Sequence, residues 1–418
     1  MEGKASGLSS LLAEGAFWRQ WLLEKALPLW HGAGWDPVNG LYHERLFQNG
    51  QPDEQAPRRL MVQARQIATY CHAVLDGLMP PAVAKQALAA FGRVRALYHA
   101  PDGQRGWIFS RTVAGQRQGA FDGRRDFYAH AFILYAHAMA GRVSQGSLQE
   151  ALRLQAQTLV EDINQLFLAP PPGRGATAAA LRPQPQNPLM HFLEALLACQ
   201  ESWESPSVTG SRFFTHWAGR IVAKCLDQMV RNVSSHGTSN QARNTGWLVL
   251  PEDFVGCNFN SPWRPSISWR VEPGHQVEWA WLLLKWLRLN PVRGGGGEST
   301  LRHQALVSAK RLALPWLEQA HFLPDAVTPT GAVMEAGQRL WPQTEKLRLL
   351  GTVLAEDPFP VAFPLKDTYS YQARAVRAAF LPDKLKGGWI DRLEQPAAFM
   401  PASSLYHIYG AARGLALL

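Results

Sequence analysis

The sequence predicts an all-α protein that is built from helical hairpins. Apolar residues recur at the i, i+3, i+4, i+7 spacing of a helix along most of the chain, as in "RLMVQARQIATYCHAVL" and "FYAHAFILYAHAMA". Several of these segments are apolar on nearly every side, which is typical of helices that pack against neighbours on two sides. Strand-like alternation is scarce, and "GWIFSRTVAG" followed by "QRQGAFDG" is the clearest hairpin candidate.

The helical segments follow one another along the chain and are separated by loops rich in glycine and proline. In chain order, the most periodic segments are "FWRQWLLEKALPLW", "RLMVQARQIATYCHAVL", "FYAHAFILYAHAMA", "LMHFLEALLACQ" and "HQVEWAWLLLKWL". The break at 169–188 is long enough for a lid or a surface loop, and the one at 290–300 looks like a flexible insertion. About a dozen helices suit a closed (α/α)6 barrel with short β-hairpins in its rim loops, although an open helical solenoid would give the same pattern. We expect one domain over residues 1–418.

The composition predicts a large buried core and gives little support to nucleic-acid binding. Hydrophobic residues make up 46% of the 418 residues and charged residues only 18%, which is enough apolar surface for a large domain. The formal net charge of +9 raises nucleic acid as a partner. However, the lysines and arginines are scattered, and neither a zinc-ligand spacing nor an RNA-binding aromatic signature is present. We therefore expect no nucleic-acid partner.

Cysteine usage and hydropathy predict a cytoplasmic protein. Cys71 and Cys199 lie in apolar helical segments, and the four cysteines are far apart, so reduced and buried thiols are expected. The first residues, "MEGKASGLSSLLAEG", carry acidic residues and lack the apolar core of a secretory signal. No run approaches the ~18–20 apolar residues that span a bilayer. We expect no membrane partner.

Polar residues recur at the N-terminal ends of the apolar helices. "QNPLMHFLEALLA" contains Asn187, His191 and Glu194, whereas "EPGHQVEWAWLLL" contains Glu272, His275 and Glu278. In both segments a histidine and a glutamate are three residues apart, so both side chains project from one face of a helix. A further histidine, His407, begins the apolar helix of "MPASSLYHIYGAARG". These positions predict a polar site where helices begin.

Two other segments add charged and aromatic side chains of the same kind. "RLWPQTEKLRLL" contributes Arg339, Trp341 and Glu345, and "RRLMVQARQIATY" contributes Arg59 and Arg65. An inward-facing arginine needs an anionic or polyhydroxylated partner.

Simpler interpretations of these residues stay open. A single histidine on an apolar face is often a hydrogen-bonded core residue. The His-x-x-Glu pairs could be surface pairs or half of a metal site, since helical-bundle metal centres use Glu-x-x-His twice. Those motifs run in the opposite order and need more carboxylates, so we expect no metal.

The same segments resemble the N-acylglucosamine 2-epimerase superfamily, which includes mannose isomerases, cellobiose 2-epimerases and sulfoquinovose isomerases. The matching blocks are "RLMVQARQ", "RRDFYAHAFIL", "QNPLMHFLEALLA", "EPGHQVEWAWLLL", "RLWPQTE" and "PASSLYHIYGA", in the order of the family. The resemblance implies an (α/α)6 barrel whose active site lies where the helix N-termini and long loops gather.

The resemblance also implies roles for individual residues. The catalytic histidines of the family fall on His191, His275 and His407, and a sugar-binding arginine falls on Arg65. The positions that contact or orient the sugar in relatives are Asn187, Glu278, Trp341 and Glu345. Asp126 and Tyr128 match a supporting block. Phe399 and Ser403 stand where relatives carry another aromatic or polar residue, so this wall of the site departs from the family pattern.

We therefore expect a sugar isomerase that interconverts an aldose and its ketose, with D-mannose and D-fructose as the expected pair. The route is a cis-enediolate formed by histidine acid–base catalysis, without metal or cofactor, because histidine titrates near neutrality. Glu278 is expected to orient His275. Arg65 and a protonated His191 are expected to stabilise the developing negative charge.

Several alternatives remain at this stage. A 2-epimerase of the same superfamily, acting on N-acylglucosamine or cellobiose, or a sulfoquinovose-type isomerase would use the same residues. A glycoside hydrolase would need two carboxylates such as Glu278 and Glu345, and a helical interaction scaffold would need none. A phosphate or sulfonate on the substrate would need further basic residues, for which Arg59, Arg182 and Arg339 are candidates. An isologous homodimer is a common assembly and stays open.

Overall fold

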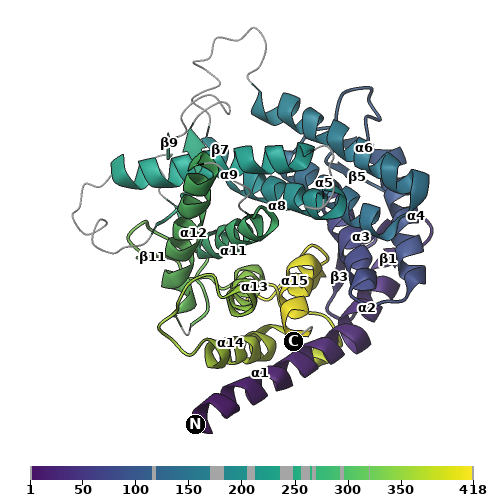
Figure 1. Cartoon of the computed structure of the whole chain (residues 1–418). Coiled ribbons are helices and arrows are strands. Elements are labelled where there is room, and N and C mark those ends of the chain that lie inside the picture. Colours follow the sequence, from purple (N-terminus) through teal and green to yellow (C-terminus); the bar gives the residue numbers. More distant parts are fainter. Residues whose placement is uncertain are drawn as a thin grey trace.

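Helices predominate in the structure, which is a computed structural model (Figure 1). The predicted all-helical class is confirmed. The residues that it describes are 2–114, 119–169, 183–204, 212–235, 248–255, 264–265, 270–291, 296–319 and 321–416.

Among these residues, six helices form an inner ring. They are α3 (Leu60–Leu75), α5 (Phe127–Val143), α8 (Asn187–Trp203), α11 (Pro273–Leu289), α13 (Leu340–Glu356) and α15 (Ser404–Ala416). Each inner helix contacts the next one along the chain, and α15 contacts α3, so the contacts return to the first helix (Figure 1). These helices are buried on nearly all sides, which explains why their sequences lack a broad polar face.

An outer layer of helices covers the inner ring. It consists of α1 (Glu2–Trp21), the π-helical turn η1 (Leu22–Ala26), α2 (Leu27–Gly32), α4 (Pro81–Tyr98), α6 (Gly146–Ile163) with the π-helical turn η2 (Asn164–Leu168), α9 (Phe213–Ser235), α12 (Gly296–Leu317), α14 (Leu365–Phe380) and the 3₁₀ turn η3 (Asp383–Leu385). Helices α4, α6, α9, α12 and α14 each pack on the inner helix that precedes them in the chain. Helix α1 packs on α15 and α14, so the N-terminal helix pairs with the C-terminal one (Figure 1).

Short antiparallel strands occupy the loops that lead into the inner helices. The strands are β1 (Trp35–Asp36), β2 (Leu41–Tyr42), β3 (Arg45–Phe47), β4 (Arg58–Arg59), β5 (Ser110–Arg111), β6 (Phe121–Asp122), β7 (Pro183–Pro185), β8 (Asp253–Val255), β9 (Arg264–Pro265), β10 (Ala326–Val327), β11 (Val333–Glu335) and β12 (Phe399–Pro401). They form the sheets β1–β2, β3–β12, β4–β5–β6, β7–β8–β9 and β10–β11. The predicted hairpin is confirmed as β5–β6. Because β4, β7 and β12 come just before α3, α8 and α15, the strands gather where inner helices begin.

The predicted breaks lie partly outside the described residues. Of the break at 169–188, residues 170–182 are outside, and of the break at 290–300, residues 292–295 are outside. Cys71 and Cys199, predicted to be reduced and buried, are free thiols in the core, as is Cys225, whereas Cys257 is outside the described part. None of the helices in the described ranges is long and apolar enough to cross a membrane.

Polar contacts tie the first inner helix to the last. Asp76, which caps the C-terminus of α3, accepts hydrogen bonds from Arg413 Nε at 2.6 Å and from Tyr409 Oη at 2.7 Å, both on α15. Nearer the other end, Gln66 Nε2 donates to Ala402 O at 2.7 Å. One apolar core, with members from Leu11 to Leu415, fills the space between the helices. The position of α15, and of His407 on it, depends on these contacts.

We predict that Asp76→Asn lowers the free energy of unfolding by about 1–3 kcal/mol, because Arg413 loses its charged acceptor. The measurement is a urea denaturation curve, with the midpoint reduced at an unchanged m-value. Asp383→Asn is the control, because Asp383 pairs with Lys25 while its side chain is 89% exposed, and no measurable change is expected. Equal midpoints for Asp76→Asn and the unmodified protein would show that the Asp76–Arg413 contact does not stabilise the packing of α15 on α3.

Candidate active site

Every inner helix contributes a side chain from its first two turns to a single cavity. The cavity has a volume of about 330 Å3, which is the size of a small-molecule site. Its lining includes Arg65 of α3, Tyr128 of α5, His191 of α8, His275 of α11, Trp341 of α13 and His407 of α15. The N-terminal ends of helices carry a partial positive charge, so this end of the ring favours negative charge.

The three predicted histidines lie in this one cavity, and two of them contact Trp341. The ring centroids of His275 and Trp341 are 4.8 Å apart, and those of Trp341 and His407 are 5.9 Å apart. The ring centroids of His191 and His407 are 6.5 Å apart. Gly274 makes this packing feasible, because a Cβ atom there would lie 2.5 Å from a Trp341 ring carbon. The Pro-Gly start of α11 therefore lets Trp341 approach the first turn.

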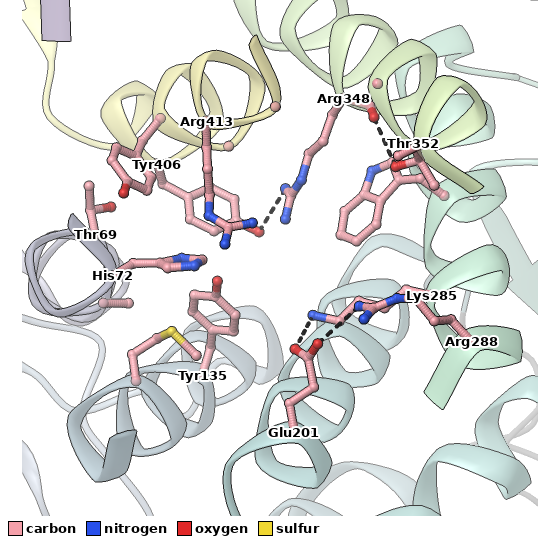
Figure 2. A pocket seen from close by; sticks show the side chains of 18 of the residues that line it. Thr69, His72, Tyr135, Glu201, Lys285, Arg288, Arg348, Thr352, Tyr406 and Arg413 are labelled. Atoms are coloured by element: carbon pink, nitrogen blue, oxygen red, sulfur yellow. Dashed lines mark hydrogen bonds and ion pairs between the residues drawn. The ribbon is translucent and has the colours of Figure 1, made fainter. Parts of the chain in front are cut away.

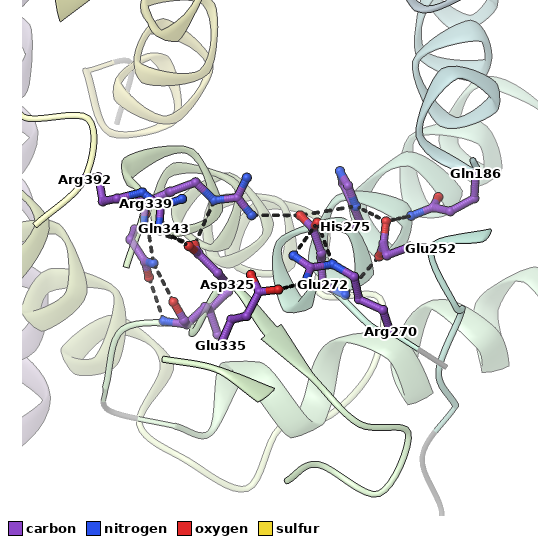
Figure 3. Close-up of polar contacts among 11 residues, drawn as sticks. Gln186, Glu252, Arg270, Glu272, His275, Asp325, Glu335, Arg339, Gln343 and Arg392 are labelled. Carbon is purple, nitrogen blue, oxygen red and sulfur yellow. Dashed lines mark hydrogen bonds and ion pairs between the residues drawn. The ribbon is translucent and has the colours of Figure 1, made fainter. Parts of the chain in front are cut away.

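His275 is held by Glu252, and the prediction that Glu278 orients it is wrong. The His275 Nδ1 atom lies 2.6 Å from Glu252 Oε2, and Glu252 Oε1 accepts the backbone N–H of Glu272 at 2.9 Å (Figure 3). Burial lowers the pKa of His275, but the nearby charges of Glu252 and Glu272 outweigh burial and raise its pKa above the usual value. His275 therefore favours the protonated form.

His407 is held by Glu345 and stays neutral. The His407 Nδ1 atom lies 2.7 Å from Glu345 Oε1, while Trp281 Nε1 donates to Glu345 Oε2 at 2.9 Å. Burial lowers the pKa of His407 in spite of the favourable hydrogen bond to Glu345. With an ionised Glu345, Nδ1 carries the proton, and the Nε2 lone pair is available as a base.

His191 is also neutral, and the prediction of a protonated His191 is wrong. Its Nδ1 atom lies 3.1 Å from Glu194 Oε2 and 3.6 Å from Glu278 Oε1. Burial lowers the pKa of His191 to about 4. Burial, together with the charges of Glu345 and Glu194, raises the pKa of Glu278 well above its usual range, so Glu278 carries a proton.

Arg65 is fixed by the wall of the cavity. Its Nη2 atom donates to Tyr128 Oη at 2.6 Å and its Nη1 atom to Ser403 O at 3.2 Å, while the guanidinium lies over the Phe132 ring at 4.0 Å. Tyr128, expected only to support the fold, therefore belongs to the site. Asp126 is a supporting residue, since its side chain caps α5 at the N–H of Ala129.

Phe399 and Ser403, the two positions before His407 that depart from the family pattern, lie in different places. Ser403 lines the cavity. Phe399 instead packs under the guanidinium of Arg45, at 4.1 Å from its ring centroid, on the paired strands β12 and β3. Only Ser403 is positioned to meet a ligand.

Several buried polar atoms around the cavity lack a hydrogen-bond partner within the described parts of the chain. They are Arg65 Nε, Asn187 Oδ1 and both carboxyl oxygens of Glu278. Buried polar atoms are normally paired, and all three side chains line the cavity. Donors and acceptors interleaved in this way suit a small ligand that carries several hydroxyl groups.

Two of the three basic residues considered for a phosphate, Arg59 and Arg339, pair with carboxylates. Arg339 lies in the lining, and its Nε atom donates to Asp325 at 2.8 Å, while its Nη2 atom donates to Glu272 at 3.0 Å (Figure 3). Arg59 Nε donates to Glu44 at 2.6 Å. Arg182 is outside the described residues.

Among the described residues, two groups of side chains have ligand atoms close enough together to hold a metal ion. They are His191 with Glu194 and Glu278, and His275 with Glu252 and Glu272, and the atoms of each group lie within 4.8 Å of one another. In both groups a carboxylate already pairs with arginine, because Glu194 contacts Arg348 at 3.0 Å and Glu272 contacts Arg270 at 3.1 Å. A metal ion would have to compete with these guanidinium groups.

Sequence reasoning missed Glu252, Asp391, Arg348 and Tyr406. Glu252 comes directly before strand β8, and Asp391 accepts a hydrogen bond from Ser404 at the start of α15. The carboxylate of "LVLPEDF", which follows an apolar run, is a signal that could have pointed to Glu252. Glu345, expected to contact or orient the sugar, lies behind His407 and orients its ring.

Comparisons with known proteins agree on one family. Residues 40–411 match the family described as N-acylglucosamine 2-epimerase. A mannose-6-phosphate isomerase of Rhizobium meliloti (strain 1021) is 29% identical over 408 residues, which cover 93% of each chain.

Similar solved structures have the same fold. A D-mannose isomerase has a TM-score of 0.71 at 18% identity, covering 95% of this chain and 96% of its own. The cellobiose 2-epimerase of Spirochaeta thermophila DSM 6192 has a TM-score of 0.69 at 20% identity, covering 98% and 97%. Because the family match spans almost the whole sequence, this chain belongs to the N-acylglucosamine 2-epimerase family.

Proposed function

We propose that this protein is a metal-independent aldose–ketose isomerase that interconverts D-mannose and D-fructose through a cis-enediolate. The observation that carries the proposal is the set of three histidines around one cavity, each with Nδ1 against its own carboxylate. We further propose that residues 1–418 form a single catalytic domain with a closed (α/α)6 barrel. The ring of contacts among the inner helices supports this architecture.

His407 is the base of the proposed reaction. Its neutral imidazole removes the proton from C2 of the open-chain aldose, and the electrons of the C–H bond form the C1=C2 bond. The imidazolium of His275 gives its proton to O1, which neutralises the enediolate as it forms. His407 then returns its proton to C1 on the same face. At the same time the O2–H proton passes to His275, and the C2=O carbonyl forms. His191, Arg65 and the protonated Glu278 hydrogen-bond the sugar oxygens.

A 2-epimerase of the same family is a second candidate, and one observation favours it. His275 and His407 flank Trp341 and contact it from different helices. If the two rings face opposite sides of C2, His275 could return a proton to the face away from His407. The product would then be the C2 epimer of the aldose rather than a ketose.

We expect D-mannose to yield D-fructose in heavy water containing EDTA, with deuterium at C1, because the base exchanges its proton with solvent. His407→Gln should lower kcat by about 10²–10⁴-fold, the usual contribution of a general base. The readouts are NMR of the products and initial rates. His303→Gln, on the exposed face of α12, is the matched control. Glucose as the sole product would favour the epimerase instead, and turnover unaffected by His407→Gln would contradict the proposed base.

The pH dependence tests the role of His275. The proposed reaction needs His407 without its proton and His275 with it, so kcat/KM should fall on both sides of neutrality. The pKa of His275 is raised by Glu252, so its proton is lost as the pH rises through that raised value. Glu252→Gln keeps an acceptor but removes the charge, so the alkaline limb should move to lower pH while the acid limb stays. A profile that shifts equally for the exposed control Glu150→Gln would count against this assignment.

The substrate should be a free sugar rather than a sugar phosphate. Arg339 is already paired, so we expect kcat/KM for mannose 6-phosphate to be at least about tenfold below that for mannose. Asp325→Asn removes the carboxylate that binds both Arg339 and Arg392 at 2.8 Å, and it should raise the relative rate on the phosphorylated sugar. Competition between the two sugars measures both effects. A preference of the unmodified protein for mannose 6-phosphate would refute this prediction.

A further inference from the structure

A second cavity lies at the opposite end of the inner helices. Its volume is about 380 Å3, and its lining comes from the later turns of α3, α5, α8, α11, α13 and α15 (Figure 2). Residues such as His72, Lys285 and Arg413 line it. One lining residue, Arg348 of α13, also reaches the carboxylates behind the active-site histidines.

Arg348 contacts two of the carboxylates that hold histidines. Its Nη2 atom donates to Glu194 Oε1 at 3.0 Å, and its Nη1 atom lies 3.6 Å from Glu345 Oε2. The other oxygens of these carboxylates face His191, at 3.1 Å, and His407, at 2.7 Å. A single guanidinium therefore lies behind two separate carboxylate–histidine pairs.

The surroundings of Arg348 fix its position and leave it little freedom. Its guanidinium lies over the Trp281 ring at 3.8 Å, and Trp281 itself donates to Glu345. Tyr406 donates a short hydrogen bond to the same oxygen of Glu194 that accepts from Arg348. The Arg348 side chain keeps an exposed fraction of 17%, on the side of the second cavity.

The charges at this point balance only when Arg348 is present. Glu194, Glu278 and Glu345 are fully buried, and Glu278 carries a proton. Arg348 contacts both ionised carboxylates, so its removal would leave two buried negative charges without the cation that they share. Because an isolated buried carboxylate is strongly unfavourable, one of the two would take up a proton.

A proton on either carboxylate would reverse its hydrogen bond to histidine. An ionised carboxylate can only accept, so the histidine must donate from Nδ1 and leave the Nε2 lone pair towards the cavity. A protonated carboxylate would donate to Nδ1 instead, and the ring proton would move to Nε2. A histidine in that tautomer cannot act as a base at Nε2.

We propose that Arg348 is a positioning residue, which keeps Glu194 and Glu345 ionised and thereby fixes His191 and His407 in the Nδ1–H tautomer. Its effect on catalysis rests on the proposed function, since it requires His407 to be the base. Its effect on the tautomers does not depend on any reaction.

The test uses full-length protein labelled with 15N-histidine, and NMR reports which ring nitrogen of His191 and His407 carries the proton. Arg348→Met should move at least one of the two rings to the Nε2–H tautomer and lower kcat by about 10²–10⁴-fold, as wrong-tautomer variants do elsewhere. Arg348→Lys keeps the charge and should keep the tautomers. Arg288→Met is the matched control: it removes an arginine from the same cavity, paired with Glu201 and Glu356 rather than with a histidine-bound carboxylate, and should leave both rings unchanged.

Chemical rescue gives a second readout. Arg348→Ala opens a space that is continuous with the second cavity, so added guanidinium ion should enter, restore the Nδ1–H tautomers and recover part of the activity. If Arg348→Met fails to fold, Arg348→Gln replaces it, because glutamine keeps donors but removes the charge.

Unchanged tautomers in the uncharged variants would overturn the proposal, whatever the activity. If the unmodified protein turns over no sugar, the proposed function fails, whereas the tautomers still decide the role of Arg348.

Discussion

The pairing of each buried imidazole with a buried carboxylate is the constraint on which the site depends. Burial disfavours the charged form of both partners, so each group alone would be neutral. Burial lowers the pKa of His191 and of His407, whereas the charges near His275 outweigh burial, and the carboxylates also differ in their other contacts. Glu194 and Glu345 share their charge with Arg348, and the pKa values of His191 and His407 are lowered. Glu252 has no ion pair with a guanidinium in the described part of the chain, and with Glu272 it raises the pKa of His275. The same pair of residue types thus shifts the histidine pKa in opposite directions within one cavity.

The arrangement of the helices brings these pairs together. Each inner helix begins at the end of the ring that carries the β-strands, so residues near the helix starts lie close together. Some of these residues are hundreds of positions apart in the sequence. Arg65 on α3 meets Ser403, which comes just before α15, only because the last inner helix packs against the first. At the far end, Asp76 and Arg413 join the same two helices. The geometry of the site is therefore sensitive to contacts at the opposite end of the molecule.

The sequence predicted the parts of this arrangement that local patterns determine. Helical periodicity gave the fold class, and the histidines at the starts of apolar helices gave three residues that do line one cavity. Spacing could not choose partners, however. His191 and Glu194 are three residues apart and interact at 3.1 Å, whereas His275 and Glu278 have the same spacing on α11 and do not form a pair. His275 turns instead to Glu252, which is 23 positions away and comes from a rim loop. Arg348 lies in the segment "RLWPQTEKLRLL", which was noted for Arg339, Trp341 and Glu345, but the need for its charge follows only from carboxylates on two different helices.

The balance of charge in the cavity favours a reaction with a transient anion over the binding of a permanent one. Arg65 and Arg339 face the ligand, but Arg339 is paired with Glu272 and Asp325, and Glu272 and Asp391 also line the wall. A phosphate beside Arg339 would therefore meet carboxylates of its own sign and a cation that is already paired. The enediolate of the proposed reaction differs because its charge appears only as C2 loses its proton, and in that proposal His275 donates the proton that neutralises it. Donors held in place before the reaction stabilise the transition state more than the ground state, which is the requirement for catalysis rather than for tight binding.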